Sequence, residues 1–209
     1  MNYLIGIDLG TSATKTVLFD ENGTVIASAS KEYPMYQPQN GWAEQKPEDW
    51  REAALETITR VVKESGVDKD EIKGIGISGQ MHGLVMLDEN NEVIRPSIIW
   101  CDQRTAKECE EITEKVGNER LIEITANPAL TGFTASKILW VRNHEPENYA
   151  KCRHILLPKD YVRLILTGEY ATEVSDASGM QLLDVPNRCW SDEVLEKLDI
   201  DKRMLAKVY

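Results

Sequence analysis

The stretch Ile5–Asp20, IGIDLGTSATKTVLFD, decides how the chain begins to fold. It holds two short runs rich in Ile, Leu, Val and Phe, which favour β-strands, on either side of a turn of small and hydroxyl-bearing residues. The first run ends at the acid Asp8 and the second starts at Lys15. We therefore predict strands over 3–8 and 15–20, joined by a turn that places a carboxylate beside several small side chains.

The flanking sequence extends this pattern into an α/β fold. Thr24–Ser30 alternates apolar and small residues after a strong Asn-Gly turn signal, which predicts a third strand and an antiparallel three-strand meander. Pro47–Ser65 has the pattern of a helix, with Pro in its first turn, acids after it and a glycine following its last residue. The apolar run Ile72–Ser78 then predicts a strand that pairs in parallel, is central and is covered on both faces.

The remaining chain is predicted to be mostly helical. A hairpin is expected around Asp88–Asn91, and a loop rich in Pro, Gly and hydroxyl groups over Asn127–Thr134. The other expected helices are 103–116, 119–125, 136–143, 159–166 and 191–198. This order is an α/β arrangement. A three-strand meander that leads into a helix and a parallel strand indicates a ribonuclease-H-like (actin-like ATPase) core, with a mixed sheet flanked by helices.

Composition and charge exclude several classes of protein. The 209 residues are 42% apolar, which is enough for the core of one domain, and 24 basic against 35 acidic residues give a net charge of −11. Such an acidic chain lacks the basic excess needed to bind nucleic-acid phosphates, and no apolar stretch reaches the roughly 18 residues of a membrane span. Scattered cysteines and the lack of a signal-peptide pattern predict a cytoplasmic location.

The turn after the first strand has the character of a phosphate-binding loop. Its small residues let backbone N–H groups approach an anion, and its hydroxyls and lysine add donors and positive charge. These residues are Gly10, Thr11, Ser12, Thr14 and Lys15. Asp8 beside them suits Mg²⁺, because Mg²⁺ prefers carboxylate, water and phosphate oxygens. The turn is not a Walker A loop, and a plain hairpin turn with small residues is the alternative interpretation.

Longer motifs give the chain a specific family resemblance. GIDLGTSATKTVLFD resembles the first phosphate loop of the FGGY carbohydrate kinases, and GFTASKILWVRNH at 132–144 has the spacing of a signature of that family. ISGQMHGLVMLD at 77–88 resembles the sugar-binding segment of the xylulokinase branch. The segments GWAEQKPEDW, PKDYVRLILTGEYATEVSDASGM and WSDEVLEKLDI are similar to the same branch. The resemblance covers nearly all of the sequence.

The resemblance implies an ATP- and Mg²⁺-dependent enzyme that phosphorylates D-xylulose to D-xylulose 5-phosphate, and a homodimer when full length. Another family member acting on ribulose or gluconate, or a non-catalytic sugar-binding module, is the alternative. Family members are much longer and carry their catalytic aspartate in a Gly-rich segment further downstream. Residues 1–209 are therefore expected to be an N-terminal domain, truncated before that segment and a second domain, and inactive alone.

The resemblance also gives roles to single residues. Asp8 would act in catalysis by orienting Mg²⁺ through water, and the turn residues would bind the ATP phosphates. Met81 and His82 would contact the sugar, since Met packs on carbon and His bonds to hydroxyls. The flanking Gly79 and Gly83 would let the ligand come close, because they carry no Cβ. A strand-end cap for the acid and a structural role for the histidine are the alternatives.

Two further residues are expected near the substrate. Trp100 would stack on the sugar, with a core tryptophan as the alternative. Asp102 would line the cleft, with a helix cap as the alternative. Lys137 and Trp140, three residues apart on a predicted helix, are expected to pack and support the site.

Overall fold

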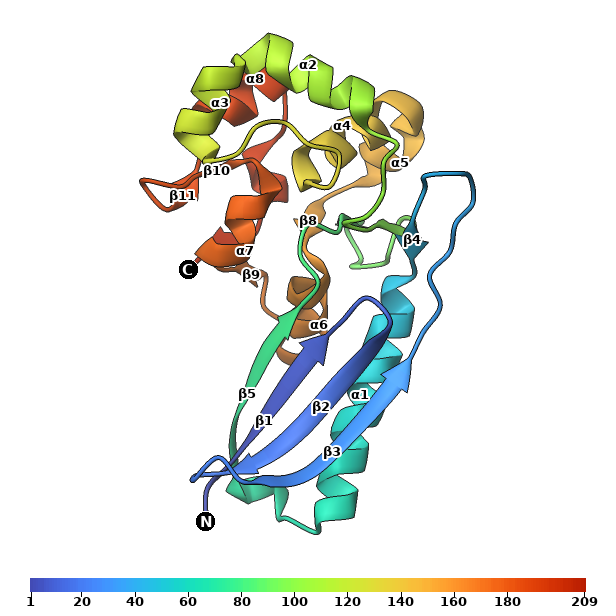
Figure 1. The fold of residues 1–209 in the computed structure, drawn as a ribbon, viewed down its shortest axis with the longest axis vertical. Coiled ribbons are helices and arrows are strands. Elements are labelled where there is room, and N and C mark those ends of the chain that lie inside the picture. Colours follow the sequence, from blue (N-terminus) through green and yellow to red (C-terminus); the bar gives the residue numbers. More distant parts are fainter.

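The computed structural model describes all of residues 1–209 and has two parts (Figure 1). A four-stranded sheet and the long helix α1 (Pro47–Ser65) form one part, and a group of shorter helices forms the other. Helix α6 (Pro158–Thr167) contacts both α1 and the sheet, so it lies where the two parts meet. The N-terminus lies at the far end of the sheet from the helical part (Figure 1).

The sheet has the mixed topology that the sequence predicts. Strands β1 (Tyr3–Leu9), β2 (Ala13–Asp20) and β3 (Val25–Glu32) form the antiparallel meander. Strand β5 (Ile72–Gly79) pairs in parallel with β1, which gives the order β3-β2-β1-β5. The prediction that this last strand is central is wrong: β1 is its only partner in the sheet, and its Ile75 is 49% exposed.

Helix α1 covers one face of this sheet and matches its predicted bounds. Pro47 occupies the first turn with two acids, and the helix ends at Gly66, whose φ of 67° is the left-handed conformation that glycine adopts without strain. The apolar core between helix and sheet is Ile5, Ile7, Leu18, Ala29 and Val61. Figure 1 shows no helix over the opposite face of the sheet, where Leu4 is 51% exposed.

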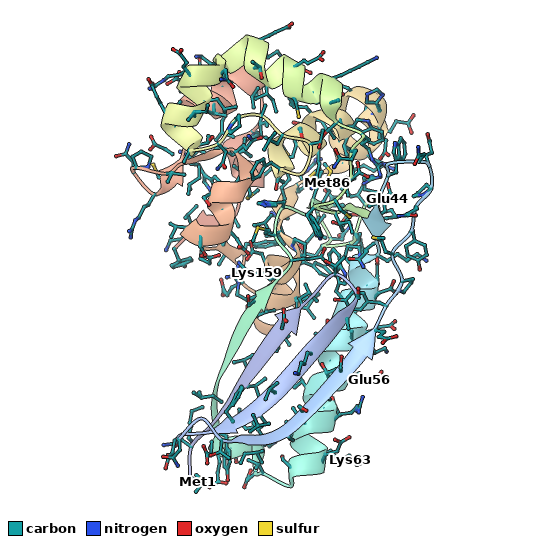
Figure 2. All side chains as sticks on the ribbon, viewed as in Figure 1. Met1, Glu44, Glu56, Lys63, Met86 and Lys159 are labelled. Carbon is teal, nitrogen blue, oxygen red and sulfur yellow. The ribbon has the colours of Figure 1, made fainter.

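The helical part is built around the larger core. Besides α6, its helices are α2 (Ala106–Val116), α3 (Asn118–Thr125), α4 (Thr134–His144), α5 (Pro146–Lys151), α7 (Val174–Ala177) and α8 (Asp192–Leu198). The predicted helices are all present with small shifts at their ends, whereas α5 and α7 were not predicted. Buried residues of α2, α3, α4, α7 and α8 share a cluster of 24 residues. The cluster includes Met86, which Figure 2 labels in this part, far from Met1 and Lys63 at the other end of the molecule.

The hairpin predicted around Asp88–Asn91 is only partly present. Its turn forms, and single antiparallel bridges join Leu87 to Val93 and Leu84 to Ile98. The continuous pairing of β6 (Val85–Leu87) is with β8 (His154–Leu156) and not with β7 (Ser97–Ile98). Strand β7 pairs instead with β4 (Glu44–Gln45). Pro96 lacks the N–H that a continuous hairpin ladder would need, which explains why the ladder is interrupted between Val93 and Ile98.

The remaining strands are two-residue pairs at the edge of the helical part. They are β9 (Ala171–Thr172), β10 (Leu183–Asp184), β11 (Cys189–Trp190) and β12 (Lys207–Val208). Among all helices of the structure, none combines the length and the apolar character that crossing a membrane requires.

Candidate functional site

One cavity is lined by residues of β1, β2 and β5, and another mainly by the segments that follow β1 and β5. The first, of about 420 Å³, is lined by Gly6, Ile7, Asp8, Lys15, Val17, Phe19, Gly76, Ile77 and Ser78. The second, of about 340 Å³, is lined by Gly10, Thr11, Gly79, Gln80, Met81, His82 and Trp100. The second begins where the two parallel strands end, which is where open α/β sheets bind ligands. The fold thus brings the predicted phosphate loop and the predicted sugar segment to one place.

The phosphate loop is a tight turn with free backbone donors. The N–H of Gly10 donates to the carbonyl oxygen of Ala13 at 3.0 Å and closes the turn. Neither Thr11 nor Ser12 donates a hydrogen bond from its backbone N–H to an acceptor in the chain. Consecutive free N–H groups in a turn form a concave site for anions, so the geometry suits phosphate oxygens.

Asp8 lies beside this turn on the first cavity. It is exposed, and it pairs in register with Lys15, which is exposed on the same cavity. A single exposed carboxylate next to free N–H donors suits Mg²⁺ that keeps several waters and binds phosphate oxygens. No cluster of three or more His, Cys, Asp or Glu residues is present that could enclose a metal ion. Asp8 is therefore the residue of this loop that could hold such an ion, in a shared rather than a fully protein-made site.

His82 is held in a defined orientation in the second cavity. Its backbone has a φ of 64°, an uncommon conformation for a residue other than glycine. Nδ1 lies 3.1 Å from the carbonyl oxygen of Gly179, and the ring packs edge-on to Phe133 at 4.6 Å. A carbonyl oxygen only accepts, so Nδ1 carries the proton and Nε2 of the neutral ring is an acceptor. Burial, followed by the charge of Lys137, lowers the pKa of His82 and favours this neutral form.

Lys137 supports the same segment from the buried side. Its ammonium donates to the carbonyl oxygens of His82 and Gly132, both at 2.8 Å, and the hydroxyl of Thr134 donates to the His82 carbonyl at 3.1 Å. The side chain is fully buried in α4. Burial lowers the pKa of Lys137 to about 7, although the nearby Asp102 acts in the opposite direction. The helix thus fixes the backbone from which the His82 ring projects.

The two glycines beside this segment serve packing, so the sequence-based explanation for them is wrong. A Cβ on Gly79 would lie 2.7 Å from Leu9 Cβ and 2.8 Å from the Leu9 carbonyl oxygen. A Cβ on Gly83 would lie 2.6 Å from the ring of Pro158. Both distances are shorter than van der Waals contact, so neighbouring protein atoms, rather than a ligand, require these glycines.

Trp100 lies on the cavity and not in the core. Its indole is 46% exposed, and Nε1 donates to the hydroxyl of Thr11 at 3.0 Å. This bond joins a residue predicted to touch sugar to a residue predicted to touch phosphate. Met81, at 47% exposed, lines the same cavity and offers an apolar surface.

Asp102 is not brought into either cavity. It is completely buried, and its carboxylate accepts from Arg104 Nη2 at 2.7 Å and from the Ala43 N–H at 2.6 Å. The guanidinium of Arg104 in turn lies over the rings of Trp42 and Trp140, at 3.7 and 4.8 Å from their centroids. This buried ion pair is well satisfied. It supports the region behind the site, so the structure separates Asp102 from the other predicted sugar residues.

Thr14 is also separated from the cavities. It is fully buried in β2, and its hydroxyl donates to the Tyr33 hydroxyl at 3.4 Å. Its role is therefore on the inner side of the turn. Of the other predicted residues, Asp8 and Lys15 line the first cavity and Ser12 is exposed at the tip of the turn. The second cavity brings together Gly10, Thr11, Met81, His82 and Trp100.

Three polar residues that bond to the turn from beneath were not predicted from the sequence. Tyr33, Gln45 and Gln80 all bond to its backbone carbonyls. Two signals were available. Gln80 lies inside the GQMHG segment, and Gln45 is an amide two residues before a helix that begins with Pro and carries a buried Trp50. Buried amides without an obvious partner in the sequence are a sign of such a network.

The chain is similar to known proteins over nearly its whole length. Residues 3–209 match the sequence family described as the FGGY family of carbohydrate kinases, N-terminal domain. A xylulose kinase from Lactococcus lactis is 47% identical over 208 residues, which are 100% of this chain and 41% of that protein. The chain thus spans about two fifths of the length of this curated relative.

Solved structures of sugar kinases superpose closely on the chain. A protein described as a xyloylose kinase from Brucella ovis is 38% identical with a TM-score of 0.94, over 100% of this chain and 43% of that protein. A gluconate kinase from Lactobacillus acidophilus is 32% identical with a TM-score of 0.92, over 100% of this chain and 42% of that protein. These matches confirm the predicted fold class and the predicted family resemblance.

Proposed function

Because the chain belongs to the FGGY family of carbohydrate kinases, we propose that the whole protein transfers the γ-phosphoryl group of ATP to D-xylulose and forms D-xylulose 5-phosphate. One observation carries this proposal. The indole of Trp100 donates to the hydroxyl of Thr11, so a candidate sugar-stacking surface and a candidate phosphate turn share one hydrogen bond. A phosphoryl acceptor and a phosphoryl donor must meet in this way for direct transfer.

Each group on the cavities has a task in this reaction. The turn's free N–H groups would donate to phosphate oxygens, and Lys15 would add a positive charge. Neutral His82 would accept a hydrogen bond from a sugar hydroxyl at Nε2, while Met81 and Trp100 would cover the carbon skeleton. Phosphoryl transfer depends mainly on positioning and on charge stabilisation, so rigid placement of these groups is the main contribution of the residues on the cavities.

The lining of the first cavity also fits a magnesium ion. Asp8 would hold it through water. Bound there, the ion neutralises charge on the phosphate oxygens. The base that takes the proton of the sugar hydroxyl is proposed to come from the length that the relatives carry beyond the matched region.

Gluconate is the second candidate substrate, because a gluconate kinase is among the similar structures. Gluconate carries a carboxylate, which would favour a cation in its binding site. The second cavity has none: its lining residues are uncharged, and burial keeps His82 neutral. The ammonium of the nearby Lys137 already donates to two carbonyls. This lining therefore supports a neutral sugar such as D-xylulose over gluconate.

A substrate panel tests the proposal. The whole protein is assayed for ADP release with ATP and Mg²⁺ on D-xylulose, D-ribulose, gluconate and glycerol. We expect the highest kcat/KM with D-xylulose. A higher value with gluconate would overturn the choice of sugar, and no ADP release with any of the four would overturn the proposed reaction. Light scattering on the same preparation tests the predicted homodimer.

A further inference from the structure

Gln45 is an uncharged side chain with no exposure to solvent, placed directly under the phosphate turn. Its Nε2 donates to the carbonyl oxygen of Thr11 at 2.7 Å, and its Oε1 accepts from the indole N–H of Trp50 at 3.3 Å. An indole N–H can only donate and a carbonyl can only accept, so these two partners fix which way the amide faces.

Gln80 forms the second half of the support. Its Nε2 donates to the Gly10 carbonyl oxygen at 3.3 Å and to the Oε1 of Gln45 at 2.8 Å. Tyr33 adds a hydroxyl that donates to the same Gly10 carbonyl at 2.5 Å. The Oε1 of Gln80 is buried without any partner. A buried acceptor without a partner lowers the stability of the protein. The two hydrogen bonds that Nε2 donates therefore offset the cost of burying this side chain.

Because the peptide group is planar, these contacts fix the orientation of the loop backbone. In a trans peptide the carbonyl of one residue and the N–H of the next point in opposite directions. Holding the Gly10 carbonyl on the buried side therefore directs the Thr11 N–H to the open side. Holding the Thr11 carbonyl does the same for the Ser12 N–H. These are the two N–H groups of the turn that find no acceptor in the chain.

We propose that Gln45 and Gln80 are positioning residues for phosphoryl transfer: they fix two successive peptide planes so that the N–H groups of the turn face the phosphate oxygens of the nucleotide. The identity of the anion rests on the function proposed above. The orientation of the turn does not, because it follows from contacts within the chain. Neither glutamine is expected to touch the nucleotide.

Substitutions that keep size and remove the amide test the proposal. In the whole protein, Gln45→Met and Gln80→Met should each lower kcat/KM for ATP by about tenfold to a hundredfold, the range expected when a reacting group is misplaced by about 1 Å. In Gln45→Met the KM for the sugar should change by less than about threefold, because Gln45 does not line the second cavity, whereas Gln80 does. Gln45→Glu should fail like the methionine variant, because a carboxylate still accepts from Trp50 but cannot donate to Thr11.

A double variant and a matched control separate positioning from loss of stability. Because the two amides bond to each other, Gln45→Met with Gln80→Met should cost much less than the two single losses combined. Thr57→Val is the control: its buried hydroxyl bonds to Thr16 at 2.7 Å and to the Ala53 carbonyl at 2.8 Å, between α1 and the sheet and away from both cavities. It should lower the melting temperature and leave the kinetics of ATP unchanged.

Hydrogen exchange gives a readout that needs no substrate. The peptide that contains residues 10–14 should exchange faster in both methionine variants than in the wild type, and at the wild-type rate in Thr57→Val. If the wild type phosphorylates none of the sugars, the proposed function fails, and the exchange data alone decide whether the glutamines hold the turn. Unchanged exchange in the loop, or kinetic losses in Thr57→Val equal to those of the glutamine variants, would overturn the positioning role.

Discussion

The indole nitrogen of Trp100 lies 3.0 Å from the hydroxyl oxygen of Thr11, although 89 positions separate the two residues in the chain. Trp100 follows β7 in the helical part, whereas Thr11 is in the turn between β1 and β2. A side chain from one part of the molecule therefore bonds to the phosphate turn of the other. Any change in this bond should therefore affect ligand binding at both cavities.

Trp100→Phe tests this coupling. Phenylalanine keeps an aromatic face for the sugar and removes only the indole donor. One neutral hydrogen bond contributes about 0.5–1.5 kcal/mol, so kcat/KM should fall by about twofold to tenfold for both D-xylulose and ATP. Initial rates with each substrate varied in turn would measure both values. A loss seen with the sugar alone would show that the bond to Thr11 does not link the two sites.

Asp8→Asn tests the expected role of this carboxylate toward magnesium. The amide has nearly the same shape and no charge, so the exposed position should tolerate it without loss of fold. We expect kcat at saturating Mg²⁺ to fall by about a hundredfold or more, as when a charge-stabilising group is removed from an active site. Circular dichroism would check the fold. A variant that keeps most of its kcat would show that Asp8 only terminates the strand.

Lys137→Met tests how the buried amine beneath the sugar segment affects the free energy of unfolding. The usual lysine pKa of 10.5 applies to the unfolded chain, and burial lowers the pKa of Lys137 in the folded chain to about 7. Between these values the unfolded state binds more protons, so the free energy of unfolding rises with pH. The cost of burying the charge is fully present below about pH 7 and disappears as the pH approaches 10.5.

The pH dependence of stability should therefore differ between the two proteins. From pH 7.5 upward the wild type should gain up to about 1.4 kcal/mol per pH unit relative to Lys137→Met, the value for one proton. Urea unfolding of both proteins at several pH values in this window would measure the difference. A difference that stays constant with pH would show that the amine of Lys137 keeps an ordinary affinity for protons in the fold.

Local patterns predicted the positions of helices and strands better than they predicted which strands pair with each other. Pro47–Ser65 was predicted to the residue, because both ends carry their own signals: a proline with acids at one end and a glycine at the other. The neighbours of β5 and β6 depend on residues far away in the chain. No local pattern shows that Val85–Leu87 pairs with His154–Leu156.

The candidate site shows the same limit. The turn at Gly10 and the segment at His82 could be identified because each is a compact motif. The inward direction of the Asp102 side chain could not be identified in this way. Asp102 pairs with Arg104, and Arg104 packs on two tryptophans that are distant in the sequence. Gln45 acts on the turn from 34 positions away in the chain, so its contact becomes visible only in the folded structure.

His82 gives the most specific prediction about sugar choice. Nδ1 is occupied by the Gly179 carbonyl oxygen, so only Nε2 is free to accept from a hydroxyl. His82→Ala should lower kcat/KM for D-xylulose by several-fold to about tenfold, the value of one lost hydrogen bond, and leave the KM for ATP unchanged.

Protonation of His82 would turn Nε2 from an acceptor into a donor. Because burial lowers the pKa of His82 below its usual 6.5, kcat/KM for the sugar should stay level from pH 8 to 6.5 and fall only in more acidic solution. Rates for both proteins across this range would show whether the acidic fall disappears in His82→Ala. An equal fall in the two proteins, or a loss confined to ATP, would assign His82 a structural role and move the recognition of the sugar to another residue of the second cavity.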